Sequence, residues 1–222
     1  MVLLLPDGET DSRRRPSALS YAAQLPFART LARAGGADGL AVHVVRYRTR
    51  GWNSGGDPAD DALWAADEVV RRYGDIPVCL VGHGMGGRAA LRGAGHSAVN
   101  SVLAMAPWLP EGAEPEPVKQ LAGRRVLIVH GTNDARTDPE LSYRLAERAK
   151  KSNRDTCRFE VHSDGHALRQ HRSEVVSLAA DFIGGSLFAR SYARPVADAF
   201  AAPPPLGLRM PLAAGFGRSL RH

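Results

Sequence analysis

The stretch Cys79–Leu91 reads CLVGHGMGGRAAL. It opens on an apolar run typical of a buried strand, turns through closely spaced glycines, and continues at once with residues that favour a helix. Glycine lets two stretches of backbone approach closely where a strand gives way to a helix. Two functional motifs share this strand–turn–helix context, and the rest of the chain decides between them.

The first motif is G-x-G-x-x-G, formed by Gly82, Gly84 and Gly87. In a dinucleotide-binding fold these glycines seat a pyrophosphate at the N-terminus of the helix. That fold also needs an acidic residue at the end of the next strand, about 20 residues further on. Here the next strand ends at Met105–Trp108, which reads MAPW and carries no acid. The dinucleotide interpretation is therefore the weaker alternative.

The second motif is the nucleophile elbow G-x-S-x-G, with Gly84 at the position of the serine. Residues 82–87 resemble the GHSMGG elbow of the α/β-hydrolase superfamily. Further along, His130–Asp134 (HGTND) resembles the segment that carries the acid of that superfamily, and His166 follows the last expected strand. Triads of the superfamily run nucleophile, acid, histidine in chain order. The resemblance covers residues 1 to about 188.

The resemblance implies a role for each of these residues. His166 and Asp134 would be catalytic, with the nucleophile position vacant at Gly84. The oxyanion hole would be formed by the backbone amides of Met85 and of Gly8, which lies in the turn after the first strand. Losing the nucleophile closes the ordinary acyl-enzyme route, at a cost on the order of a millionfold in turnover.

The pattern along the chain predicts an α/β fold. Strand-like runs alternate with helical ones, which favours a mostly parallel sheet of about six strands flanked by helices. Too few residues separate the later strands for a lid domain of ordinary size, and we expect an open pocket near Trp52, Trp108 and Trp64. The expected strands are Val2–Leu5, Ala41–Arg46, Val78–Val81, Val102–Ala106, Val126–His130 and Cys157–Val161, and the expected helices are Ser17–Ala34, Asp60–Tyr73, Met85–Gly93, Pro139–Lys151 and Ala167–Ile183.

We expect one domain over residues 1–188, followed by a flexible tail over residues 189–222, which is rich in proline, alanine and arginine. The net charge of +6 comes from 26 arginines scattered along the chain beside only 3 lysines. No basic stripe interleaved with aromatic residues is present, so nucleic-acid binding is not expected. The start has no signal-peptide pattern and no segment is long and apolar enough to span a membrane, so we expect a cytoplasmic protein without membrane contact.

Several other residues invite a catalytic or metal-binding interpretation. Asp138 is the main rival to Asp134, but it precedes a proline and is typical of a helix N-cap. Asp164 is a weaker rival. We expect His83 to be structural and His130 to order the turn that carries the acid. His162 and His166 have no evident third ligand, and Cys79 and Cys157 fit buried strand positions, so no metal, cofactor or disulfide is expected.

Three functional hypotheses remain open. The first is an atypical enzyme that acts on a carbonyl-containing small molecule or peptide. It would use His166 and Asp134 as a general base with an oxyanion hole, in an epimerase, lyase or water-mediated hydrolysis reaction. Atypical members of the superfamily that lack the usual nucleophile include the bottromycin epimerase. The second is an inactive ligand-binding pseudohydrolase. The third is a serine esterase inactivated by a change at Gly84.

Overall fold

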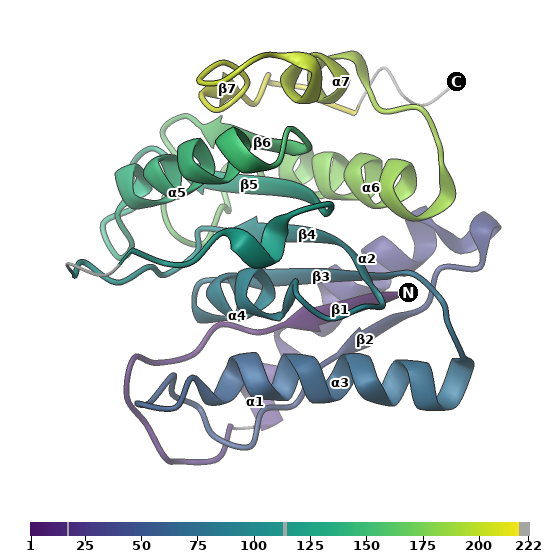
Figure 1. The fold of residues 1–222 in the computed structure, drawn as a ribbon, viewed down its shortest axis with the longest axis vertical. Helices are drawn as coiled ribbons and strands as arrows, with labels where there is room; N and C mark the ends of the chain where they lie inside the picture. Colours follow the sequence, from purple (N-terminus) through teal and green to yellow (C-terminus); the bar gives the residue numbers. More distant parts are fainter. Residues whose placement is uncertain (17, 113–114, 218–222) are drawn as a thin grey trace.

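The computed structural model describes residues 1–16, 18–112 and 115–217. Its centre is a seven-stranded parallel sheet with the order β2-β1-β3-β4-β5-β6-β7. Figure 1 shows the strands following one another in this order, from β2 at the bottom to β7 at the top. The strands are β1 (Val2–Leu5), β2 (Val42–Val44), β3 (Val78–His83), β4 (Val99–Met105), β5 (Arg125–Gly131), β6 (Thr156–Val161) and β7 (Met210–Pro211). The expected mostly parallel α/β sheet is confirmed, with one strand more than expected.

Helices cover both faces of the sheet because successive strand residues point to opposite faces. In β1, Leu3 packs into a core with α3, α4 and α5, whereas Leu4 packs into a second core with α2, α6 and α7. Both cysteines are unpaired and buried in the second core. The helices are α1 (Ala18–Ala22), α2 (Leu25–Ala34), α3 (Asp57–Tyr73), α4 (Met85–Gly93), α5 (Pro139–Ser152), α6 (Arg172–Phe188) and α7 (Arg194–Ala201).

The sheet register brings four separate loops to one edge. Leu5 at the end of β1 pairs with Gly82 in β3, and Gly131 at the end of β5 pairs with Val161 at the end of β6. Because parallel strands end at the same edge of a sheet, the segments after β1, β3, β5 and β6 lie together. Those segments carry the residues that the sequence singles out as functional.

The segment after residue 188 differs from the flexible tail expected over residues 189–222. It forms helix α7 and then strand β7, whose Met210 pairs with Phe159 in β6. Val196 in α7 and Leu208 before β7 are fully buried, and the Lys150 ammonium donates to the Ala199 carbonyl at 2.8 Å. A few well-spaced apolar residues anchor this segment to the sheet, although its composition suggests disorder. Residues 218–222 lie outside the described residues.

Several helical boundaries also differ from expectation, and α3 begins at Asp57 rather than Asp60. The long helix expected over Ser17–Ala34 is divided into α1 and α2, with Pro26 in the first turn of α2, and Ser17 itself lies outside the described residues. The last long helix begins at Arg172 rather than Ala167. None of the helices in the described part of the chain combines the length and the apolarity that crossing a bilayer requires.

Candidate active site

The turn between β3 and α4 is built around glycines that leave no room for side chains. A Cβ atom on Gly82 would overlap the Gly86 carbonyl, and one on Gly86 would overlap the Leu5 carbonyl. Gly84 itself adopts φ 55° and ψ −118°, a conformation that side chains disfavour. The sharp bend allows α4 to start directly behind the end of β3, so the amide of Met85 points into the site.

The side-chain position at Gly84 is filled by another residue. A Cβ atom on Gly84 would overlap Oδ1 of Asp7, which follows β1. That oxygen accepts hydrogen bonds from the Met85 amide at 2.9 Å and from the Gly8 amide at 2.8 Å. The two amides expected to form an oxyanion hole therefore do converge on one point. In this structure they hold a carboxylate oxygen that belongs to the protein itself.

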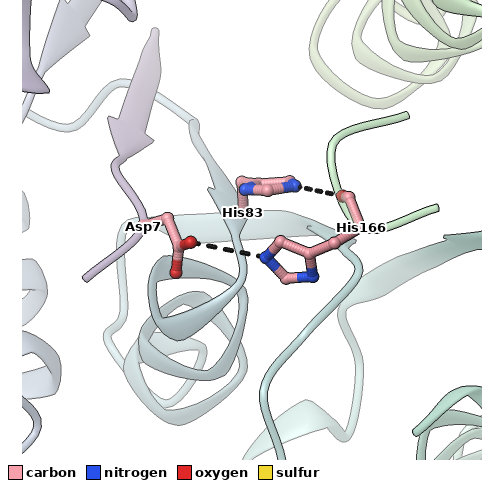
Figure 2. Close-up of side chains that lie close together, drawn as sticks. All are labelled: Asp7, His83 and His166. Carbon is pink, nitrogen blue, oxygen red and sulfur yellow. Dashed lines mark hydrogen bonds and ion pairs between the residues drawn. The ribbon is translucent and has the colours of Figure 1, made fainter. Parts of the chain in front are cut away.

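His166 lies between two carboxylates. Its Nδ1 is 2.9 Å from Oδ2 of Asp134, and its Nε2 is 3.3 Å from Oδ2 of Asp7. Figure 2 shows the Asp7 carboxylate pointing toward the His166 ring, with the His83 ring beside it. With the imidazole protonated, both of its N–H groups donate, one to each carboxylate. The structure thus joins Gly84, Asp134 and His166 in one site, with Asp7 completing a row of three ionisable groups.

The charges in this row reinforce one another. Burial lowers the pKa of His166, but its hydrogen bonds to Asp7 and Asp134 outweigh burial and raise that pKa overall. Burial raises the pKa of Asp7, but the hydrogen bonds from His166 and the Met85 amide lower it to about 2. Arg136 adds a second cation, with Nη1 2.9 Å from Oδ2 of Asp7. The two ionised carboxylates therefore favour the protonated form of the His166 imidazole between them.

Asp134 is the best-supported acid of the three candidates. Its Oδ1 accepts from the backbone amides of Arg136 (2.8 Å) and Thr137 (3.0 Å), and its Oδ2 accepts from the Thr137 hydroxyl at 2.6 Å. Burial raises the pKa of Asp134, but hydrogen bonds from His130 and Thr137 outweigh it and hold that pKa far below the usual range. This environment keeps the carboxylate ionised and fixed beside Nδ1 of His166.

The rival acids have other roles. Asp138 is the N-cap of α5 and accepts from the Glu140 amide at 2.8 Å. Asp164 is buried and accepts from the amides of Gly165 and His171, so it shapes the loop that carries His166. The loop includes residues 167–171, where the sequence predicted the first part of the last long helix.

The other histidines are placed as follows. His130 is fully buried between Asp134 and Ser142, where it supports the turn after β5. His83 lies 2.7 Å from the His166 carbonyl through Nε2, and burial lowers its pKa, so a neutral ring supports the His166 loop. His162 is exposed.

A metal ion could be considered at this site, because potential ligand atoms of Asp7, His83 and His166 lie within 4.8 Å of one another. Asp7 and His166 already pair with each other, and His166 also pairs with Asp134. The Arg136 guanidinium lies against the same Asp7 oxygen that a metal would need. A second cation there would be repelled, so the charges favour a proton rather than a metal on His166.

A cavity of about 280 Å³ lies beside Asp7 and His166. Asp7, Met85, Arg136 and His166 line it together with Trp108. The Trp108 ring packs edge-on against the buried Trp52 ring, with centroids 6.1 Å apart. Trp64 does not belong to this site, because it is 62% exposed on α3 and lines a different hollow. Asp7 also lines a second cavity of about 460 Å³, together with Arg15, Arg46, Arg48 and Arg50.

Asp7 is the residue that the sequence interpretation missed. The turn Pro6–Glu9 is recognised there only as a source of a backbone amide. The available signal was an acidic residue directly before Gly8, in the loop that faces an elbow without a side chain. Arg136 and Thr137 were also missed, and both depend on the path of the loop after β5.

The ionised Asp7 carboxylate is expected to stabilise the fold in a pH-dependent way. Its pKa of about 2 lies below the usual value near 4, so its contribution is fully present above about pH 4 and is lost as the pH falls toward 2. We expect the difference in unfolding free energy between wild type and Asp7→Asn to shrink by roughly 2 kcal/mol over that interval. Urea unfolding at a series of pH values measures this, and a difference that does not change with pH would contradict the assignment.

Comparisons with known proteins identify the fold. No family model matches the chain, and no curated protein matches it. Among solved structures, an esterase from Pyrococcus furiosus is similar with a TM-score of 0.66, at 16% identity over 84% of this chain and 82% of that one. A protein from Xanthomonas campestris assigned to the α/β-hydrolase superfamily has a TM-score of 0.57, at 19% identity over 85% of this chain and 99% of that one.

An α/β serine hydrolase homologue from Coxiella burnetii has a TM-score of 0.58, at 17% identity over 81% of this chain and 82% of that one. These similarities extend over most of each chain, and they agree with the parallel sheet described above. The protein has the α/β-hydrolase fold.

Proposed function

We propose that the protein is an atypical α/β-hydrolase-fold enzyme in which His166, held by Asp134, transfers protons at a carbonyl-containing small molecule or peptide. The observation that carries this proposal is the 2.9 Å contact between Nδ1 of His166 and Oδ2 of Asp134. His166 also lines the cavity of about 280 Å³, where a substrate could reach it. A carboxylate on one ring nitrogen fixes the orientation of the imidazole and leaves the other nitrogen for proton transfer.

A serine nucleophile plays no part in this proposal. Gly84 offers no hydroxyl at the elbow, and Asp7 fills the space in which one would lie. Proton transfer by His166 needs neither a hydroxyl at residue 84 nor the space that a serine side chain would occupy. Removal of a proton next to a carbonyl would give epimerisation or elimination, and activation of a water molecule would give hydrolysis.

The amides of Gly8 and Met85 support this chemistry because they already bind an anionic oxygen. A developing enolate or tetrahedral oxyanion could replace Oδ1 of Asp7 between them. Moving the Asp7 carboxylate away would also remove one of the two groups that raise the pKa of His166. The imidazole would then more readily lose its proton and act as a base when substrate is bound.

The test is solvent-deuterium exchange into small carbonyl compounds and short peptides, with wild type, His166→Ala and His162→Ala compared. His162 lies in the same loop and is exposed, so its variant is the matched control. We expect exchange in wild type and in His162→Ala, and a loss of about 100-fold or more in His166→Ala. Exchange that persists without His166 would contradict the proposal.

A second candidate function is ligand binding without turnover. The observation in its favour is that Asp7 already satisfies both amides and pairs with His166 and Arg136, so the site is occupied by its own side chain. Saturable binding of a carbonyl compound by wild type, with no exchange and no hydrolysis, would favour this candidate over the enzyme.

A further inference from the structure

Four arginines gather around one cavity next to the candidate active site. This cavity has a volume of about 460 Å³ and is lined by Arg15, Arg46, Arg48 and Arg50, and we call it the arginine cavity. Asp7 is the one acidic residue among the described residues that line it. Its volume is in the range of sites that bind small molecules, roughly 300–1,000 Å³. Positive charge is therefore concentrated in a space that suits a small anion.

Three of these arginines come from the chain that follows β2, where burial alternates from residue to residue. Val45 and Tyr47 are buried, whereas Arg46, Arg48 and Arg50 are exposed. In an extended chain, successive side chains point to opposite sides, so every second residue shares a side. The apolar residues hold this segment to the core and leave the arginines on the side of the cavity.

Two of the four guanidinium groups already have acidic partners. Nε of Arg48 is 2.5 Å from Oδ1 of the buried Asp61, and Nη2 of Arg50 is 3.3 Å from Oε1 of Glu9. The charges of these two arginines are thus balanced within the protein.

The other two guanidinium groups are not balanced in this way. Within residues 1–16, 18–112 and 115–217, neither Arg15 nor Arg46 forms an ion pair with a carboxylate. Arg46 lies instead over the Tyr21 ring, with its guanidinium carbon 4.8 Å from the ring centroid. Asp7 does not compensate for them, because its Oδ2 pairs with Arg136 at 2.9 Å. The arginine cavity therefore carries about two uncompensated positive charges.

The arginine cavity adjoins the candidate active site at the turn after β1. Asp7 lines both cavities. The Arg50 carbonyl accepts from the Glu9 amide at 3.0 Å, and a Cβ atom on Gly8 would overlap the same carbonyl. The segment that carries the arginines is thus fixed against the turn that supplies the Gly8 amide. An anion held by the arginines lies next to the turn that carries Asp7.

We propose that the arginine cavity binds a phosphate group, and that the substrate is a phosphate monoester that also carries a carbonyl group. The carbonyl part of this inference rests on the proposed function, and the phosphate part rests on the arginine cavity. Guanidinium groups bind phosphate oxygens through pairs of parallel N–H donors. A phosphate monoester carries about 1.5–2 negative charges at pH 7. It therefore matches Arg15 and Arg46 together, whereas a carboxylate would balance only one of them.

The bound phosphate also affects the residue that occupies the amides. In the proposed function, a substrate oxygen replaces Oδ1 of Asp7 between the amides of Gly8 and Met85. The negative charge of a phosphate beside Asp7 opposes the charge of that carboxylate and favours its replacement. A phosphorylated substrate thus helps to open the site that its carbonyl group enters.

The first experiment measures the binding of inorganic phosphate by isothermal titration calorimetry at constant ionic strength. The test variant is Arg15→Gln with Arg46→Gln. The matched control is Arg29→Gln with Arg33→Gln, which removes two exposed arginines of α2 that are not among the described lining residues. We expect the test variant to bind phosphate at least about 10-fold more weakly than wild type, because charged hydrogen bonds are lost, and the control to bind it as wild type does.

Two results of this titration would overturn the inference. One is the absence of phosphate binding to wild type, and the other is the same affinity in the test variant as in the control. Acetate serves as the carboxylate probe, and we expect it to bind wild type more weakly than phosphate. Tighter binding of acetate would overturn the choice of phosphate.

The second experiment compares solvent-deuterium exchange into hydroxyacetone phosphate and into hydroxyacetone. In wild type and in the control we expect kcat/KM to be at least about 10-fold higher for the phosphate ester, and this advantage to disappear in the test variant. Equal kcat/KM for the two compounds in wild type, with exchange that depends on His166, would overturn the inference and leave the proposed function standing. Phosphate binding that depends on Arg15 and Arg46, without exchange into either compound, would support the phosphate site and contradict the proposed function.

Discussion

The double variant Gly84→Ser with Asp7→Ala is expected to hydrolyse p-nitrophenyl acetate at least about 1,000-fold faster than wild type. The substitution at Gly84 supplies a hydroxyl close to His166. The substitution at Asp7 removes the carboxylate that fills this space and occupies the amides of Gly8 and Met85. The remaining His166–Asp134 pair would then support a serine nucleophile in the ordinary way.

Gly84→Ser alone is expected to give almost no esterase activity, because its side chain would overlap Asp7. The backbone at residue 84 strains a serine by about 1–3 kcal/mol in both variants. The overlap between the new side chain and Asp7 occurs only in Gly84→Ser, so this single variant should be less stable than the double variant. Gly84→Ala with Asp7→Ala is the matched control without a hydroxyl. Strong activity of Gly84→Ser alone would contradict the position assigned to Asp7.

Asp134→Ala is expected to lower the free energy of unfolding by roughly 3–5 kcal/mol, because it leaves buried donors without their charged acceptor. The Arg136 and Thr137 amides and the His166 ring all lose a partner. Asp138→Ala removes an exposed helix cap and is expected to cost only about 1 kcal/mol. Urea unfolding measures the loss of stability in each variant, and so compares Asp134 with Asp138, its main rival in the sequence analysis.

Asp134→Asn separates the effect on stability from the effect on the proton transfer proposed for His166. It keeps the shape of the side chain but offers an amide where His166 needs an acceptor, so activity that depends on His166 should fall by about 10,000-fold. Equal destabilisation by Asp134→Ala and Asp138→Ala, or full activity of Asp134→Asn, would contradict the role given to Asp134.

Much of the fold follows from local patterns in the sequence. The run from Val78 to Val81 is apolar throughout, as expected for a strand covered on both faces, and it lies at the centre of the sheet. Prediction failed where structure depends on a few distant contacts. The segment after residue 188 is rich in proline, alanine and arginine, a composition that suggests disorder, yet Val196 and Leu208 are buried against the sheet.

The candidate site was predictable in part, for the same reason. Gly84, Asp134 and His166 belong to short motifs whose spacing is local, and the sheet register brings them together. Asp7 belongs to no such motif. Its importance arises because β1 pairs beside β3, which places an acidic side chain against an elbow that has none of its own. Only the three-dimensional arrangement reveals that the space beside Gly84, where a nucleophile side chain would lie, is filled by Asp7.

The central claim is that Asp7 occupies the elbow as an ionised partner of His166. Its most direct test is the titration of the His166 ring by NMR in wild type and in Asp7→Asn, with the signal assigned from its loss in His166→Gln. We expect the pKa of His166 to lie above the usual value near 6.5 in wild type and to fall clearly in Asp7→Asn, because burial then opposes the charge with one carboxylate fewer. The same midpoint in both proteins would contradict the account.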